Sequence, residues 1–210
     1  MVAKNRSKIP KLFCRGAPMV EVRRDLIGVS TNKSWADVKA LNWDLVKDSQ
    51  RGKHKDTDLK SPAQHCEYMY LAHTEGWSYS GRLKYLLQCR SIVVMHPLNY
   101  IQHFHHLLNG NDSSPDQNVV QVSLPFGKHL DEAMNSLLSK RETDWEEKVL
   151  SNSWDNLREK YLTPAANNCY WRRQFRAYGA LQKFKPSIEL KAGLLGLPGA
   201  VRPFYTRVGL

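Results

Sequence analysis

The sequence predicts an α/β fold in which a parallel β-sheet is flanked by helices. Along the 210 residues, short apolar segments alternate with segments whose apolar residues recur at helical spacing. The segment SIVVMH, residues 91–96, has an uninterrupted apolar centre, which is typical of a strand covered on both faces. It follows a strand-like segment, a polar loop and an amphipathic segment within about 30 residues, and that order predicts a βαβ unit.

The expected strands are short segments that contain several apolar or aromatic residues. The expected strands are residues 11–17, 37–45, 67–73, 91–96 and 119–122. The expected helices begin at recognisable caps or carry apolar residues at helical spacing. They cover residues 18–29, 62–66, 80–89, 97–108, 128–140, 143–161 and 163–184.

The helix starts are the most specific local signals. Ser61 and Pro62 form an N-cap and a first helical residue. Thr143 is followed three residues later by Glu146, the spacing of a capping box, and Thr163 caps a helix that begins with proline. Residues 47–62 contain a single apolar side chain and are expected to form an exposed loop, whereas the Gly/Pro-rich residues 185–210 are expected to form an irregular tail.

The formal net charge of +11 favours an anionic partner. The basic residues are scattered and form no block of five like charges, so a nucleic-acid-binding arm is not favoured. A small basic nucleic-acid-binding module nevertheless stays the alternative to a binder of a phosphorylated small molecule. Residues 1–13 lack the apolar stretch of a secretory signal, and the longest apolar stretch, residues 192–201, is too short to span a bilayer.

Metal chemistry is not expected. The four cysteines form no CxxC pair, and His103 and His106 have no carboxylate or cysteine at a suitable spacing. Trp171, Phe175 and Tyr178 recur at helical spacing, which indicates a buried stripe rather than a platform for stacking bases.

The loop between the third strand and its helix is the strongest candidate site. Ligands of parallel α/β sheets bind beyond the carboxyl ends of the strands, where loops lead into helices. In this loop Gly76 and Gly81 permit close backbone approach, Ser78 and Ser80 offer hydroxyl groups, and Arg82 can grip a phosphate with two hydrogen bonds. The alternative is an ordinary serine cap beside a surface arginine, because the spacing matches no glycine-rich phosphate motif.

Three motifs in order resemble a known family. They are CRGA at residues 14–17, HCEYMYLAHTEGWSYSGRLKYLLQCRSIVV at 65–94 and REKYLTPAANNCYWRRQF at 158–175. From Lys11 to Ala180 the chain resembles the CAP10 family, the glycosyltransferases of family 90, and most of all its fungal branch. This family includes protein O-glucosyltransferases and capsule-related xylosyltransferases.

The resemblance implies a GT-B enzyme with two Rossmann-like halves, of which the carboxy-terminal half binds a UDP-sugar and needs no metal or other cofactor. Residues 1–184 would be this donor-binding domain, without the amino-terminal half that carries the catalytic base. Arg82 would stabilise the diphosphate leaving group while the sugar passes to a hydroxyl of a protein or glycan. The implied nucleotide-sugar site, with Ser78 added from the loop chemistry, is Arg15, Gly16, Glu75, Gly76, Ser78, Ser80, Gly81 and Arg82.

The cysteines gain meaning from the same resemblance, because family members in the ER or Golgi lumen pair cysteines near these positions. Cys66 and Cys89 are expected to bridge, with Cα atoms about 4.4 to 6.8 Å apart, and Cys169 is expected to be unpaired. The chain departs from the family pattern at Cys14, where an aromatic residue is usual, and also at Arg90 and Pro125.

Overall fold

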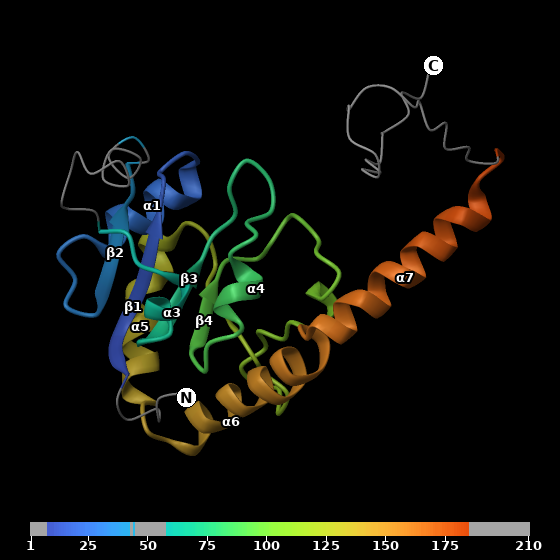
Figure 1. Ribbon diagram of the computed structural model, residues 1–210. Coiled ribbons are helices and arrows are strands. Elements are labelled where there is room, and N and C mark those ends of the chain that lie inside the picture. The colour runs from blue at the N-terminus through green and yellow to red at the C-terminus, as the bar shows by residue number, and fades with distance from the viewer. Residues whose placement is uncertain (1–7, 43, 45–57, 185–210) are drawn as a thin grey trace. The chain divides into compact units, whose positions relative to one another are not determined.

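The computed structural model describes residues 8–42, 44 and 58–184. The chain divides into two units, residues 1–170 and 171–210. The first unit contains a five-stranded, fully parallel sheet with the strand order β2-β1-β3-β4-β5 (Figure 1). The strands are β1 (Ile9–Gly16), β2 (Ala36–Ala40), β3 (Tyr68–His73), β4 (Ile92–Met95) and β5 (Val120–Gln121). The predicted α/β fold with a parallel sheet is therefore confirmed.

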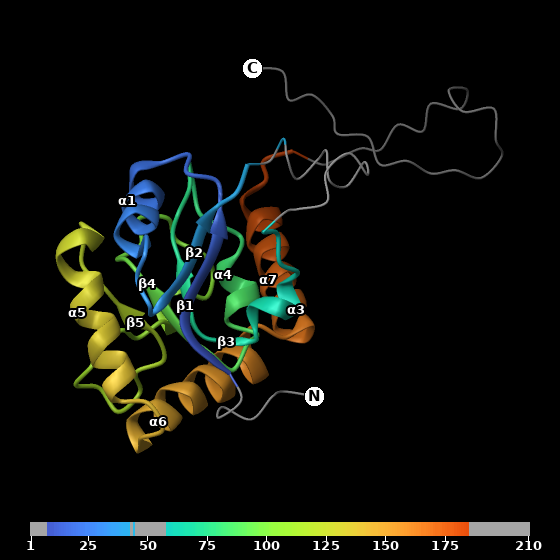
Figure 2. The same ribbon diagram turned by 90° about the vertical axis from the view of Figure 1, so that its left-hand side faces the viewer.

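Helices cover both faces of the sheet, and Figure 2 shows α1 and α5 on one side and α3 and α4 on the other. The α-helices are α1 (Glu21–Ser30), α3 (Pro62–His65), α4 (Leu83–Leu86), α5 (Phe126–Ser139), α6 (Asp144–Asn152) and α7 (Pro164–Leu181). A 3₁₀ turn, η2, spans His105–Leu107, and α6 continues into a π-helix, η3, over Ser153–Tyr161. Among the described helices, none is long and apolar enough to cross a membrane.

The core has two halves because successive strand residues point to opposite faces. Leu12 and Tyr70 pack in the cluster that includes Leu26 of α1 and Leu130 of α5. The next residues along β1 and β3, Phe13 and Leu71, pack in the opposite cluster with the α4 leucines. Both sides of the sheet are thus apolar, as expected for strands that are covered on both faces.

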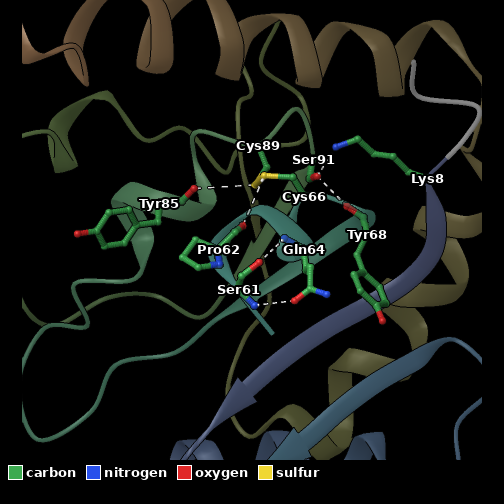
Figure 3. Close-up of a disulfide and its surroundings, with 9 residues drawn as sticks. All are labelled: Lys8, Ser61, Pro62, Gln64, Cys66, Tyr68, Tyr85, Cys89 and Ser91. Atoms are coloured by element: carbon green, nitrogen blue, oxygen red, sulfur yellow. Dashed lines mark hydrogen bonds between the residues drawn. A yellow bond between two sulfur atoms is a disulfide. The ribbon is translucent and has the colours of Figure 1, made fainter. Parts of the chain in front are cut away.

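The disulfide lies at the amino-terminal edge of the sheet. Cys66 follows α3 and lies two residues before the start of β3, and Cys89 lies three residues before β4. The two cysteines are bonded with Cα atoms 5.0 Å apart, so the predicted pairing and distance are confirmed (Figure 3). Beside it, Lys8 donates to the Ser91 hydroxyl over 2.7 Å. Burial, followed by the nearby charge of Arg90, lowers the pKa of Lys8 to about 8.

The prediction of a helix that begins at Pro97 is wrong. Residues 97–104 are irregular, and the short η2 turn follows them. Glu75 explains the difference, because its buried carboxylate accepts the backbone N–H groups of Asn99 and Tyr100 at 2.8 to 3.1 Å. These amides are bound by a side chain more than twenty positions upstream, and that contact holds the segment in a loop.

The helix expected over residues 80–89 is also wrong in length. Its regular part is a single turn, α4, although Leu83, Leu86 and Leu87 are buried as their spacing predicts. A four-residue helix has little macrodipole, because few peptide units are aligned. The helix dipole therefore adds little to anion binding at this loop.

Two other expectations fail locally. Thr143 lies at the N-cap of α6 but makes no side-chain cap bond, and Glu146 instead accepts the backbone N–H of Glu142 over 3.0 Å. In the second unit, Trp171, Phe175 and Tyr178 are 50%, 68% and 62% exposed, so their stripe is not buried within the described residues.

Two predicted helix caps and one predicted free cysteine are confirmed, whereas two predicted irregular segments lie largely outside the described residues. Ser61 caps α3 and Pro62 is its first residue, as predicted, and the cap at Thr163 is present. Cys169 is free, as predicted. Most of the expected 47–62 loop and the whole of the expected 185–210 tail lie outside the described residues.

Candidate functional site

The sheet topology places a crevice at the carboxyl ends of β1 and β3. The connection from β1 to β2 passes through α1 on one face of the sheet, and the connection from β3 to β4 passes through α4 on the other face. Neighbouring connections that leave in opposite directions form a topological switch point, where open α/β sheets bind their ligands.

A cavity occupies this switch point. It is lined by Cys14, Gly16, Arg23, Leu26, Ile27, Lys39, Thr74 and Arg82. Three of these side chains are cationic and none is a carboxylate. Because Lys39 is paired with Asp58 at 3.0 Å, the charge that is free to meet a ligand belongs mainly to the two arginines.

Arg82 reaches the cavity from the start of α4. Its Nη1 donates to the sulfur of Cys14 over 3.1 Å, and its guanidinium lies against the backbone of Gly16. A Cβ atom on Gly16 would lie 3.1 Å from Nη2 of Arg82, so a larger residue here would push the guanidinium away. Among the described residues, no carboxylate forms an ion pair with Arg82.

Arg23 enters from α1 on the other side of the crevice. Its Nε donates to the carbonyl of Glu75 over 2.9 Å and its Nη1 to the carbonyl of Ala17 over 3.3 Å. Burial lowers the pKa of Arg23 most, and the positive charge of Arg82 lowers it further. The nearby Cys14 raises this pKa and so partly offsets the shift. Two guanidinium groups that disfavour one another electrostatically form a site that an anion would stabilise.

Next to the arginines are polar groups without partners. Thr74 is 2% exposed, lines the cavity, and its hydroxyl has no hydrogen-bond partner among the described residues. Both ring nitrogens of the adjacent His73 also lack partners there. Burial, followed by the charges of Arg82 and other neighbours, lowers the pKa of His73 to about 3, so this imidazole is neutral. Buried polar groups usually have a hydrogen-bond partner, and a water molecule or a bound ligand can supply it here.

Two residues predicted to bind the nucleotide are engaged elsewhere. Arg15 donates to carbonyls of Cys14, Asp37 and Asp58 and forms a 2.7 Å ion pair with Asp37, so its guanidinium joins β1 to β2. The carboxylate of Glu75 binds the 97–100 loop, as described above. Neither side chain lines the cavity.

The other predicted residues of the loop after β3 do not line the cavity. The Gly76 N–H donates to the Ser78 carbonyl over 3.0 Å, which closes a tight turn. A Cβ on Gly76 would lie 3.3 Å from Nη2 of Arg23, so this glycine lets Arg23 approach. Ser78 is exposed, whereas Ser80 and Gly81 are partly buried. Their part in ligand binding stays a prediction.

Sequence reasoning missed Arg23, Lys39, Thr74 and Cys14 as cavity residues. One signal was available for Arg23, because a helix that directly follows the first strand also begins at the carboxyl edge of the sheet. For Lys39 and Cys14 the decisive fact is the strand register, which pairs Cys14 with Val38 and Arg15 with Lys39.

Comparison with known proteins decides the family. A model of glycosyl transferase family 90 matches residues 2–196. The chain belongs to glycosyl transferase family 90. The predicted resemblance to this family is thereby confirmed.

Curated relatives of this family 90 chain are named as O-glucosyltransferases. The "O-glucosyltransferase rumi homolog" of Aedes aegypti is 27% identical over 85% of this chain and 43% of its own length. "Protein O-glucosyltransferase 2" of Danio rerio is 25% identical over 87% of this chain and 35% of its own length. "O-glucosyltransferase rumi" of Drosophila melanogaster is 30% identical over 65% of this chain and 33% of its own length. This family 90 chain therefore spans less than half the length of these relatives.

Proposed function

We propose that this chain is the donor-binding domain of a family 90 glycosyltransferase and that the cavity binds the diphosphate of a UDP-sugar. The observation that carries the proposal is the pair of arginines, Arg23 and Arg82, at the switch point without a carboxylate in the lining. Guanidinium groups bind phosphate oxygens through charge-assisted, often bidentate hydrogen bonds. The unpartnered Thr74 hydroxyl offers a further donor to the same ligand.

In this mechanism the arginines act on the leaving group. As the bond between sugar and diphosphate breaks, negative charge grows on a phosphate oxygen, and preorganised cations in a partly buried site stabilise that charge. The two guanidinium groups supply the positive charge that a metal ion would otherwise supply, so we expect UDP binding to be insensitive to a chelator.

The acceptor is an alcohol. The curated relatives are named as O-glucosyltransferases, and by analogy we expect a glucosyl or related sugar to be transferred to a hydroxyl of a protein or glycan. Such a transfer needs a base for the hydroxyl proton. No carboxylate lines the cavity, so we expect the base to come from another part of a GT-B enzyme. The disulfide supports an oxidising compartment, such as the ER or Golgi lumen.

The proposal is tested by calorimetric titration of UDP into the wild-type chain and into Arg82→Ala. Each charge-assisted hydrogen bond contributes about 1.5 to 3 kcal/mol, so the variant should bind roughly 10- to 100-fold more weakly. Lys84→Ala is the matched control, because it removes one positive charge two positions away at an exposed site. Equal affinities for all three folded proteins would refute the assignment of Arg82.

Salt dependence separates this function from nucleic-acid binding. Binding of a single diphosphate should weaken modestly as the salt concentration rises, whereas a site that displaces several counterions from a polyanion loses affinity steeply. A chain that binds single-stranded RNA tightly but shows no saturable UDP binding would overturn the proposal.

A further inference from the structure

Cys14 is a free thiol inside the cavity. It lies on β1 two positions before the end of the strand and is 7% exposed. Its sulfur accepts the 3.1 Å hydrogen bond from Arg82, and it lines the same cavity as Arg23. The other free cysteine of the described residues, Cys169, is exposed, whereas Cys66 and Cys89 are bonded to each other.

The surroundings of Cys14 fit a reactive thiol with an anionic reaction partner. The thiolate is the form of cysteine that attacks electrophiles. Here the guanidinium of Arg82 donates directly to the sulfur. The lining contains no carboxylate that would repel an anion, and the buried Thr74 hydroxyl still lacks a hydrogen-bond partner. The sulfur is therefore placed among groups that would hold the oxygens of an incoming anion.

We propose that Cys14 is a site of reversible modification by small anionic disulfides, with glutathione disulfide as the representative of the class. The thiolate of Cys14 attacks one sulfur of the disulfide, whose S–S bond breaks as the Cys14–S–S–R bond forms. The other half leaves as a thiolate and takes up the proton that Cys14 released. The incoming disulfide is itself the oxidant, and an excess of a free thiol reverses the reaction.

The adduct also closes the diphosphate site. It removes the thiol that accepts from Arg82, and it fills space beside Gly16 and Thr74 in the same cavity. Modification and diphosphate binding should therefore exclude one another. This consequence rests on the proposed function, whereas the reactivity of Cys14 does not.

The test uses two thiosulfonates of similar size and opposite charge on the Cys169→Ser chain, which keeps Cys14 as its free thiol. The reagents are 2-sulfonatoethyl and 2-(trimethylammonium)ethyl methanethiosulfonate, and intact-mass spectrometry follows the adduct over time. Focusing by a cationic cleft raises the local concentration of an anion about 10-fold or more. We expect the anionic reagent to react at least about 10-fold faster than the cationic one, and Arg82→Gln to reduce this preference.

Control experiments test whether the adduct forms on Cys14 and whether it forms inside the cavity. The Cys14→Ser, Cys169→Ser chain should gain no adduct, dithiothreitol should restore the original mass, and glutathione disulfide should give the corresponding mixed disulfide. Inorganic pyrophosphate should slow the labelling of Cys14. A folded Cys169→Ser chain that gains no adduct, or that prefers the cationic reagent, would overturn the proposal.

The two proposals fail in different ways. If the unmodified chain does not bind UDP but Cys14 reacts with the expected charge preference, the donor-site assignment fails and the modification site stands. If UDP binds and Cys14 does not react, the modification site fails alone. UDP binding that is undiminished in the fully modified chain would refute the closure of the site by the adduct.

Discussion

Opening the Cys66–Cys89 disulfide should lower the free energy of unfolding without altering the site. The bond closes a segment with a sequence separation of 23 residues. In the chain-entropy model, a loop of this size contributes about 3 kcal/mol by restricting the unfolded chain. For a domain of this size that corresponds to a fall in Tm of roughly 6 to 12 °C.

Urea unfolding followed by circular dichroism measures this change. The oxidised wild-type chain is compared with the same chain in dithiothreitol and with the Cys66→Ala, Cys89→Ala variant. The reduced wild type keeps both sulfur atoms, so it isolates the cross-link from the packing lost on truncating buried Cys89. Cys169→Ser serves as the control, because Cys169 is free and exposed.

The disulfide and the cavity lie at opposite edges of the sheet. The disulfide lies at the amino ends of β3 and β4, whereas the cavity lies at the carboxyl ends of β1 and β3. The variant should therefore bind UDP like the wild type at temperatures where both are folded. Coincident urea midpoints for the oxidised and reduced chains would refute the loop-entropy argument, and lost UDP binding in a folded variant would refute the independence of the two edges.

Three further changes test other parts of the structure. Tyr70→Phe removes the 3.1 Å hydrogen bond to the Leu137 carbonyl near the end of α5, and urea unfolding should show a loss of about 1 kcal/mol. Glu75→Gln removes the carboxylate that binds two amides of the 97–100 loop, which should cost about 1.5 to 3 kcal/mol and make these amides exchange faster with deuterium. Burial lowers the pKa of His73 from 6.5 to about 3. Below pH 6.5 the imidazole is protonated in the unfolded chain but stays neutral in the folded chain. The free energy of unfolding therefore decreases as the pH falls, by about 2 kcal/mol between pH 7 and pH 5. His73→Leu should flatten this slope in urea titrations, and an unchanged slope would contradict the assignment.

Much of the fold could be predicted because local signals agree with the tertiary structure. The apolar centre of residues 91–96 is buried on both sides, and the Ser61 cap is present as its spacing predicts. The helix after Pro97 could not be excluded from its own residues, because the competing acceptor is the carboxylate of Glu75. Helical periodicity describes a segment in isolation and contains no information about a distant side chain that binds its amides.

At the candidate site, too, local sequence signals predicted some features, whereas others depend on contacts between distant residues. Position after a strand singled out the loop with Arg82, and the structure places Arg82 in the cavity. Arg15 carries the same charge at an equally suitable place in the sequence, yet its guanidinium bonds to Asp37 on the neighbouring strand. The contact of Arg82 with Cys14 joins residues 68 positions apart, so it depends on strand order and register. Residue type and local position therefore identified the right edge of the sheet but not the side chains that line it.

The two outer strands have a consequence for behaviour in concentrated solution. Exposed strand edges can recruit strands of other molecules, and short or charged edge strands discourage this pairing. On one side β5 is only two residues long, which leaves little backbone for an intruding strand. On the other side β2 presents Asp37 and Lys39 within five residues, and both are held in ion pairs. The sheet thus ends on both sides in strands that are poor templates for aggregation.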